Sequence, residues 1–226
     1  MASKLAVVIP ARNESDRLGP VLAALPDRLP GFDSIRVVVV DDGSGDATAT
    51  VARRAGAAVV RHRLNLGKGA ALRTGAEAAL RAGCGVLLFM DADGQHQATD
   101  IPKLLLPLQT GRADLVLGCR AFSGQMPAAM RLGNWGLSGL FQVLFGRRFR
   151  DTPSGMRAMT AAAFRKLRWD ASGYAVETEM LVRAARAGLK VAEVEIETVY
   201  HDTFKGTTPA DGVKILADMV RWRARR

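Results

Sequence analysis

Residues 85–96, with the sequence GVLLFMDADGQH, decide the fold class of this chain. A continuous apolar run ends there in two carboxylates, Asp91 and Asp93, which are separated by one residue. An apolar run of this length, bounded by glycine and polar residues, is typical of a strand buried on both faces, as in a parallel sheet covered by helices. Ligands of open α/β sheets bind outside the carboxyl ends of the strands. We therefore predict that this strand carries Asp91 and Asp93 to a ligand-binding edge of a parallel sheet.

The carboxylate pair has two interpretations. Two acids so close together repel each other unless a cation lies between them, and Mg²⁺ typically binds one or two carboxylates together with the phosphates of a substrate. An Asp-Ala-Asp-Gly segment is also a good turn at the end of a strand, because Asp and Gly are turn formers. The tetrapeptide alone does not decide between a metal site and a plain turn.

Strands and helices alternate through the first half of the chain. Residues 5–9, 35–40, 57–61, 85–91 and 114–118 are expected to be strands, with helices from Asn13 or Ser15 to about residue 25, from Asp46 to residue 54, and over residues 70–81 and 100–109. This alternation predicts a doubly wound α/β fold with a mostly parallel sheet flanked by helices. A length of 226 residues fits one domain, residues 1–226, which we divide into a first half at 1–120 and a second at 121–226.

Further acids follow the other strands. Glu14 lies in the turn after the first strand, and Asp41 and Asp42 follow the second, so that with Asp91 and Asp93 they are expected to line one edge of the sheet. A polar edge with this many carboxylates indicates a site. Its acidity suits sugar and ribose hydroxyls, base N–H donors and a metal better than it suits bare phosphate.

Two common nucleotide-binding motifs do not occur. The G-x-G-x-x-G fingerprint should follow the first strand, but residues 10–14 read PARNE. No segment matches the P-loop pattern G-x-x-x-x-G-K-[ST]. Lys68, in the turn that opens a helix, has two readings: a phosphate ligand at a helix N-terminus, or a solvated lysine.

The net charge is +10, of which +7 lies in residues 114–226. This excess indicates an anionic partner: a phosphorylated substrate, a membrane surface or nucleic acid. Nucleic acid is the weakest of the three, because the chain has only 3 Trp and 2 Tyr. Two cysteines suggest no disulfide framework, and no signal peptide or spanning segment is recognisable. We expect a cytoplasmic protein, soluble or peripheral on the cytoplasmic face of a membrane.

Two segments of the second half read as amphipathic helices. In residues 130–145, Met130, Leu137, Phe141 and Leu144 form one stripe, which favours core packing over contact with lipid. In residues 209–226, Val213, Leu216 and Val220 share one side and the segment ends in arginines, as in helices that lie on anionic membranes; a solvated terminal helix is equally compatible. Residues 174–187 are expected to form a helix, and residues 190–200 an edge strand with Glu193, Glu195 and Glu197 facing solvent.

Five segments in order carry a resemblance to a known family. They are VIPARNE at residues 8–14, VVDDGS at 39–44, NLGKG at 65–69, MDADGQH at 90–96 and DTPSGMR at 151–157. Together they resemble family-2 glycosyltransferases, and within them the dolichol-phosphate mannosyltransferase-like group. The likeness covers residues 5 to about 205, and five ordered motifs are much more specific than any single one.

The resemblance implies a GT-A nucleotide-diphospho-sugar fold, inversion at the anomeric carbon and a Mg²⁺ or Mn²⁺ ion. Residues 1–120 would bind the nucleotide-sugar, and residues 121–226, with the basic C-terminal helix, the acceptor. Asp91, Asp93 and Gln95 would hold the metal and the diphosphate. Arg120 and Lys205 would correspond to the phosphate-binding cations of the group, and Arg120 and Arg131 could hold the phosphate of a lipid acceptor. The residues that would contact the nucleotide-sugar are Pro10, Ala11, Arg12, Glu14, Val40, Asp41, Asp42, Lys68, Asp91, Ala92 and Asp93.

The acceptor stays open at this point. The first hypothesis is transfer of a hexose from GDP-mannose or UDP-glucose to a polyprenyl phosphate, with Asp93 in the catalytic centre and possible recruitment by a separate membrane protein. The second is a soluble or protein alcohol as acceptor, which needs a base; Glu177 is the first candidate and Asp151 the second. A sugar-phosphate nucleotidyltransferase is less compatible with the PARNE turn, and a non-catalytic membrane module with the intact acids of the metal motif.

Overall fold

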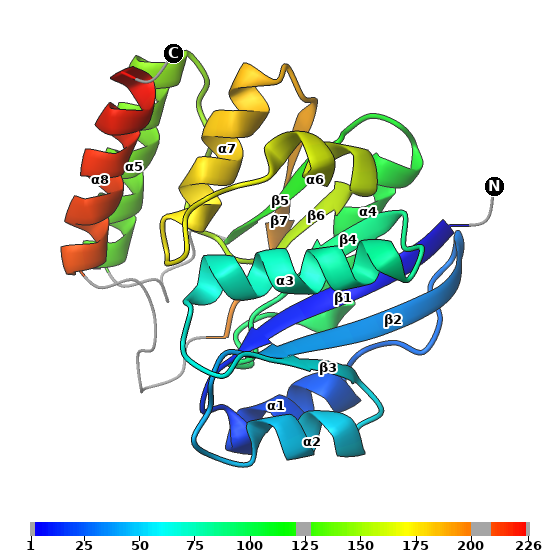
Figure 1. The fold of residues 1–226 in the computed structure, drawn as a ribbon. Helices are drawn as coiled ribbons and strands as arrows, with labels where there is room; N and C mark the ends of the chain where they lie inside the picture. Colours follow the sequence, from blue (N-terminus) through cyan, green and yellow to red (C-terminus); the bar gives the residue numbers. More distant parts are fainter. Residues whose placement is uncertain (1–2, 121–127, 200–208, 225–226) are drawn as a thin grey trace.

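The computed structural model describes residues 3–120, 128–199 and 209–224, and it contains a single seven-stranded sheet with helices on both faces (Figure 1). The strand order is β3-β2-β1-β4-β6-β5-β7, and every neighbouring pair is parallel except the two that involve β6. The strands are β1 (Ser3–Ala11), β2 (Phe32–Asp41), β3 (Ala58–Arg61), β4 (Val86–Phe89), β5 (Leu115–Arg120), β6 (Arg157–Thr160) and β7 (Val191–Ile196).

Alternate residues of the central strands face two separate hydrophobic cores. Val7 of β1 packs in the core beneath α1 (Ser15–Ala23), α2 (Thr48–Arg54) and α4 (Ile101–Gln109), which a short 3₁₀ turn at Ala98–Asp100 precedes. Val8 faces the opposite core. That core is covered by α3 (Lys68–Arg81), α5 (Ala128–Phe145), α6 (Ala161–Leu167), α7 (Val176–Arg186) and α8 (Pro209–Ala224). Because both faces are covered, the central strands β1 and β4 and the second half of β2 are almost continuously apolar, as predicted.

The predicted α/β class, the mostly parallel sheet and the single domain are confirmed. Each predicted strand and helix is present, with bounds that differ by a few residues. The predicted edge strand is also correct, since β7 is the last strand of the sheet and Glu193, Glu195 and Glu197 are exposed. The proposed division into nucleotide and acceptor halves stays a prediction.

Three local expectations were wrong or incomplete. Neither Asn13 nor Ser15 caps α1, which begins after Glu14 without a side-chain cap; the Asn13 side chain instead accepts from the Gly45 N–H. The Asp46 side chain accepts from the Thr48 N–H, but α2 begins only at Thr48. β6 and α6 were not predicted, because β6 is four residues long and starts with a buried arginine, which breaks the apolar pattern of a strand.

The antiparallel direction of β6 matters for the site. Arg157, the first residue of β6, pairs with Phe89 at the end of β4 and with Leu117 of β5. The segment before β6, residues 151–156, therefore lies at the sheet edge where β1, β2, β4 and β5 end. All five motifs of the sequence meet at this one edge.

Helices α5 and α8 pack against each other and stand together at one side of the sheet (Figure 1). Phe141 of α5 is buried and Leu137 and Leu144 are partly buried in the core, as the core-packing interpretation predicts; the side chain of Met130 lies outside the described residues. In α8 the buried residues are Ile215 and Met219. The predicted stripe of Val213, Leu216 and Val220 is the outward face of this helix, with Val213 68% exposed.

Candidate active site

The centre of the candidate site is an ion-pair bridge between three motifs. The Lys68 ammonium lies 2.8 Å and 3.0 Å from the two carboxylate oxygens of Asp91, and 2.9 Å from Oε1 of Glu177. Lys68 is the first residue of α3, Asp91 follows β4, and Glu177 is in the first turn of α7. The side chain of Glu177 is only 4% exposed, whereas that of Asp91 is 24% exposed and faces the open edge. Asp91 is therefore the most exposed member of the bridge, followed by Lys68 at 17%.

The backbone before and after Lys68 is held by hydrogen bonds from two directions. Asp42 accepts from the N–H groups of Leu66 and Gly67, at 2.9 Å and 2.8 Å. On the other side, the Gly69 N–H donates to the Ser172 carbonyl at 2.6 Å, and a Cβ at Gly69 would lie 2.1 Å from the Ala171 oxygen. Only glycine fits so close an approach of two backbones. These contacts fix the origin of the Lys68 side chain.

The carboxylates of Asp91 and Asp93 provide hard oxygen ligands at the sheet edge. Burial and the neighbouring Asp91 charge raise the pKa of Asp93, although its Oδ1 accepts from the Gln95 N–H at 3.0 Å. A bound cation would relieve this repulsion. A Cβ at Gly155 would lie 2.3 Å from Oδ2 of Asp91, so the missing side chain of Gly155 leaves the space around that oxygen open.

These residues fit a divalent metal that arrives with its own ligands. Within the described parts of the chain, no three or more His, Cys, Asp or Glu side chains are grouped so that they could hold a metal ion by themselves. Mg²⁺ commonly completes its shell with waters and substrate phosphates around one or two carboxylates. Asp91, Asp93 and Gln95 agree with that kind of site.

Asp151 and Arg120 form a closed ion pair beside this centre. Asp151 is fully buried and accepts from the backbone N–H, Nε and Nη2 of Arg120, at 3.0, 2.8 and 2.8 Å. Both carboxylate oxygens are therefore occupied. This geometry makes Asp151 an anchor for Arg120.

The turn after β1 is joined to the segment after β2. The Asn13 N–H donates to Oγ of Ser44, and the Glu14 N–H donates to Oγ1 of Thr48. Asn13 adopts a positive φ of 53°, which asparagine tolerates better than most residues. Asp41 is buried, accepts from the Ser44 N–H at 2.9 Å, and pairs with Arg61 Nε at 3.0 Å. These contacts hold the two motifs together as one rim of the site.

The structure therefore brings most of the predicted site residues to one edge, and their roles stay predictions. Pro10, Arg12, Glu14 and Gln95 are at least partly exposed, whereas Ala11, Val40 and Ala92 are buried. Arg131 is exposed on α5, and Lys205 lies outside the described residues. Sequence reasoning missed the contributions of Arg61, His62, His96 and Arg157. His96 and Arg157 were inside quoted motifs, but nothing in their spacing indicated which partners they contact.

Comparison with known proteins identifies the family. The model of "Glycosyl transferase family 2" matches residues 6–168. The chain belongs to glycosyltransferase family 2. This family-2 chain is 31% identical, over 95% of its length and 94% of the relative's, to UDP-N-acetylglucosamine–dolichyl-phosphate N-acetylglucosaminyltransferase of Methanococcus voltae. It is 35% identical, over 87% of its length and 84% of the relative's, to undecaprenyl-phosphate mannosyltransferase of Micrococcus luteus.

A solved structure has the same fold. The crystal structure of glucosyl-3-phosphoglycerate synthase from Mycobacterium tuberculosis in complex with uridine diphosphate superimposes with a TM-score of 0.79 at 24% identity, over 98% of this family-2 chain and 80% of that chain. The likeness confirms the GT-A type of fold. Together with the family assignment, it makes the protein a glycosyltransferase.

Proposed function

We propose that this glycosyltransferase moves a hexose from a nucleotide-diphospho-sugar, GDP-mannose or UDP-glucose, to a polyprenyl phosphate, with inversion at the anomeric carbon. The observation that carries the proposal is the Lys68–Asp91–Glu177 bridge at the open edge of the sheet, next to Asp93. It combines carboxylates for a metal with a cation for a phosphate at one place. Both are needed where a nucleoside diphosphate is the leaving group.

The donor would lie along the rim formed after β1, β2 and β4. Several comparable solved structures of glucosyl-3-phosphoglycerate synthase contain uridine diphosphate, and some also contain Mn²⁺ or Mg²⁺. In this chain Pro10, Arg12 and Glu14 of the rim would contact the nucleotide. Asp91, Asp93 and Gln95 would hold Mg²⁺ or Mn²⁺, which would stabilise negative charge on the diphosphate.

The reaction requires one bond to form as another breaks. An oxygen of the acceptor phosphate attacks the anomeric carbon, and the bond from that carbon to the diphosphate oxygen breaks, with the electron pair leaving on the diphosphate. Lys68, the first residue of α3, is our candidate for the cation that would bind the phosphate that gains this charge. The attacking phosphate oxygen is already anionic, so no strong base is needed.

The names of the relatives support a polyprenyl-phosphate acceptor. Two relatives at 31% and 35% identity, over most of both chains, are named for transfer to dolichyl phosphate and undecaprenyl phosphate. Arg131 is exposed on α5, and Arg120 is held in place by Asp151. These arginines are our candidates for binding the acceptor phosphate, together with Lys205.

An alcohol acceptor is the second candidate, and the position of Glu177 favours it. Glu177 is a buried carboxylate within the central bridge, 2.9 Å from the Lys68 ammonium, and it is our first candidate for the base that an alcohol would need. Asp151 is less suitable as a base, because both of its oxygens accept hydrogen bonds from Arg120. The solved neighbour, glucosyl-3-phosphoglycerate synthase, is named for a phosphoglycerate product and so for a small acceptor.

Peripheral contact with an anionic membrane belongs to the same proposal. No helix within the described ranges has the length and apolar character to cross a bilayer. Helix α5 nevertheless exposes Leu132, Trp135 and Val143, and α8 exposes Val213, Leu216 and Val220. Exposed cations accompany these apolar faces, as in helices that lie on anionic membranes: Arg131, Arg147, Arg148, Lys214, Arg221 and Arg223.

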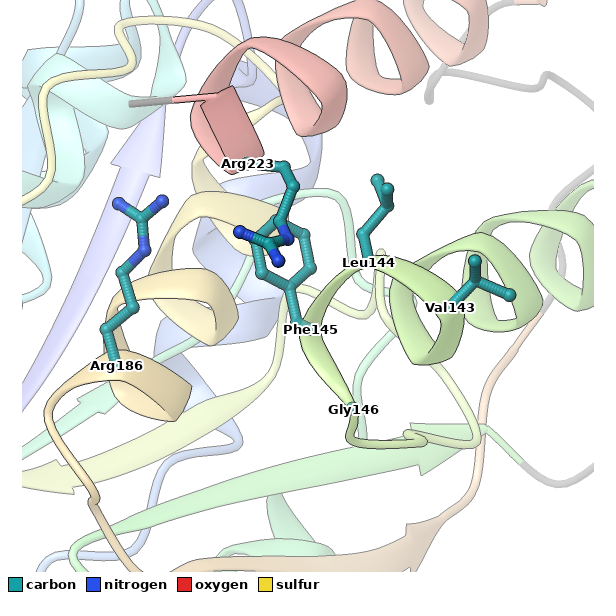
Figure 2. A pocket seen from close by; sticks show the side chains of 6 residues that line it. All are labelled: Val143, Leu144, Phe145, Gly146, Arg186 and Arg223. Atoms are coloured by element: carbon teal, nitrogen blue, oxygen red, sulfur yellow. The ribbon is translucent and has the colours of Figure 1, made fainter. Parts of the chain in front are cut away.

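A hollow of about 450 Å³ lies where the C-terminal ends of these helices meet α7 (Figure 2). Arg186 of α7 and Arg223 of α8 line it together with Phe145 and other apolar residues of α5. Arginine beside apolar surface suits a lipid headgroup at a membrane boundary. This hollow would contribute to membrane contact, because Val143 and Arg223, which line it, belong to the exposed faces of α5 and α8.

The test of the activity is transfer of labelled sugar from UDP-glucose, UDP-N-acetylglucosamine or GDP-mannose to undecaprenyl or dolichyl phosphate, with Mn²⁺ or Mg²⁺. We expect metal-dependent labelling of the lipid, lost in Asp93→Asn and retained in Asp27→Asn, which makes the same charge change at an exposed site. Hydrolysis of the donor without labelled lipid would overturn the lipid acceptor. Labelling of alcohols that is abolished in Glu177→Gln would establish the second candidate.

The test of membrane contact is cosedimentation with vesicles of neutral or anionic phospholipid. We expect binding to anionic vesicles only, weakened about tenfold when Trp135 and Val143 are both replaced by serine, because both side chains are largely exposed on α5. Leu106→Ser is the control, since Leu106 is 53% exposed on α4, on the other face of the sheet. Equal loss in that variant would contradict the assignment of the surface.

A further inference from the structure

Lys68 and a metal ion would compete for the same carboxylate. The ammonium contacts both oxygens of Asp91, and Asp91 is one of the two acids available to a divalent cation. The same ammonium lies 2.9 Å from Oε1 of Glu177, so two carboxylates hold it beside Asp91. In the free protein, Asp91 is therefore already neutralised by a cation.

A bound donor would give the Lys68 side chain an alternative partner, the diphosphate. Its backbone is fixed by Asp42 and Ser172, as described above, while its four-carbon chain can reorient from that fixed point. The N–H groups of Gly69 and Ala70 in the first turn of α3 already donate to the Ser172 carbonyl, so the Lys68 ammonium is the group of this turn that would bind an anion. A nucleoside diphosphate would offer the ammonium more negative charge than Asp91 does.

We propose that Lys68 is a positioning residue that makes metal binding depend on the donor. In the free protein its ammonium neutralises Asp91 and opposes a divalent cation. When a nucleoside diphosphate binds, the ammonium transfers to the phosphates, and Asp91 becomes available to the metal beside Asp93. This inference rests on the proposed function, because it needs a diphosphate donor.

The proposal predicts a specific pattern of linked equilibria. If Lys68 opposes the metal, its removal should strengthen metal binding to the free protein. It should also reduce the factor by which a nucleoside diphosphate strengthens metal binding, and by reciprocity the factor by which the metal strengthens nucleotide binding. Removal of a lysine with only a structural role would not raise the metal affinity of the free protein while it reduces the effect of the nucleotide on that affinity.

The experiment measures the Mn²⁺ dissociation constant of the intact chain by calorimetry or by the spin-resonance signal of free Mn²⁺, without and with UDP or GDP. Without nucleotide, we expect Lys68→Met to bind Mn²⁺ about tenfold more tightly than wild type, since a neighbouring positive charge is removed. The factor by which UDP or GDP increases the Mn²⁺ affinity should be about tenfold smaller in Lys68→Met than in wild type. Lys68→Arg keeps the charge and should resemble wild type.

Two further variants make the test decisive. Lys103→Met removes a lysine paired with Asp100 at 2.6 Å, on the other face of the sheet, and should leave Mn²⁺ binding unchanged. Lys68→Met alone leaves the buried Glu177 carboxylate without its cation, so the single variant can fail to fold. In that case the double variant Lys68→Met with Glu177→Gln replaces it, because it removes this carboxylate and keeps the net charge of wild type. It should also bind Mn²⁺ more tightly than wild type.

The failures of the two proposals can be told apart. Mn²⁺ binding without nucleotide that is unchanged or weaker in both Lys68→Met variants would overturn the role of Lys68. Absence of nucleotide binding to wild type in the presence of Mn²⁺ would instead contradict the proposed donor, while the comparison without nucleotide still tests Lys68.

Discussion

Arg157 donates a hydrogen bond of 2.6 Å from Nη1 to the main-chain carbonyl of Glu177. The same guanidinium donates to the carbonyls of Ser154 and Thr152, at 2.9 Å and 2.5 Å. Arg157 is 1% exposed, and burial lowers its pKa. One buried side chain thus joins the segment that faces Asp91 to the first turn of α7, which carries Glu177.

Replacement of Arg157 should therefore disturb both stability and catalysis. Arg157→Met removes the three hydrogen bonds to the buried carbonyls of Thr152, Ser154 and Glu177, which should lower the free energy of unfolding by about 3 kcal/mol or more. Arg157→Lys keeps the charge but cannot donate along three directions, so we expect a smaller loss of stability and a kcat at least about tenfold below wild type. Urea denaturation and steady-state kinetics measure the two effects.

The division between kcat and KM separates positioning from simple weakening of the fold. If Arg157 positions Glu177 and residues 152–154, Arg157→Lys should lower kcat at temperatures where the variant is fully folded, with little change in the KM for the donor. A fully folded variant with normal kcat would contradict this role.

The second prediction concerns Gly155. A Cβ there would lie 2.3 Å from Oδ2 of Asp91 and 3.1 Å from the Lys68 ammonium, and Gly155 is not among the glycines with a positive φ. Gly155→Ala should therefore act by displacing Asp91. We expect Mn²⁺ affinity in the presence of nucleotide and kcat/KM to fall at least about tenfold, while the thermal midpoint changes by only a few degrees.

Gly133→Ala is the matched control, because a Cβ at Gly133 meets nothing within 4 Å. Its Mn²⁺ affinity should equal that of wild type. Normal metal binding in Gly155→Ala would mean that Asp91 adjusts without cost, or that it is not a ligand.

The sheet and its polar edge were predictable because they depend on local patterns. A strand buried on both faces must be apolar throughout, so β1, β2, β4 and β5 are recognisable from residue type alone. The position of Asp91 and Asp93 then follows from strand direction. β6 was not recognisable, since Arg157 interrupts the pattern and is accommodated only by carbonyls brought from α7 and from the preceding segment.

The contacts within the site could not be predicted from the sequence, because they join segments that are far apart in the chain. Lys68 and Glu177 are 109 positions apart, and nothing in either motif indicates that they form a pair at 2.9 Å. The outward face of α8 was predicted as an apolar stripe, but a helix with apolar residues on two sides does not reveal which side is buried. Tertiary packing against α5 decides that Ile215 and Met219 are inside.

The third prediction concerns Asp42, whose carboxylate accepts from Leu66 N–H, Gly67 N–H and His62. These hydrogen bonds hold the segment that carries Lys68 in place. Asp42→Asn should destabilise the protein by about 1–3 kcal/mol. It should weaken the binding of UDP and the binding of GDP by the same factor. Calorimetric titration with both nucleotides measures that factor.

Equal losses of UDP and GDP affinity would distinguish support of the Lys68 segment from direct contact of Asp42 with the nucleotide base. A carboxylate that reads the base would discriminate between uracil and guanine, so its loss would change the ratio of the UDP and GDP dissociation constants. Such a change in Asp42→Asn would show that Asp42 contacts the nucleotide, as the family resemblance implies.

The last prediction is a pH dependence of stability caused by Asp46. Burial opposes ionisation of this carboxyl, but hydrogen bonds from the Thr48 hydroxyl and N–H and from the Ser15 N–H outweigh it and lower its pKa from 3.8 to about 2. A carboxylate whose pKa is lower in the folded state contributes stability above its unfolded pKa and loses it as pH falls through the folded pKa. The contribution should therefore be complete above about pH 5 and shrink towards pH 3.

The measurement compares urea midpoints of wild type and Asp46→Asn from pH 7 to pH 3. The difference between the two should be constant from pH 7 to pH 5 and decrease below that, because only wild type has this carboxylate to protonate. Asp27→Asn, at an exposed position, should show no such trend. A difference that stays constant down to pH 3 would mean that the contacts to Ser15 and Thr48 do not favour the ionised form, and that Asp46 joins α1 to α2 by neutral hydrogen bonds alone.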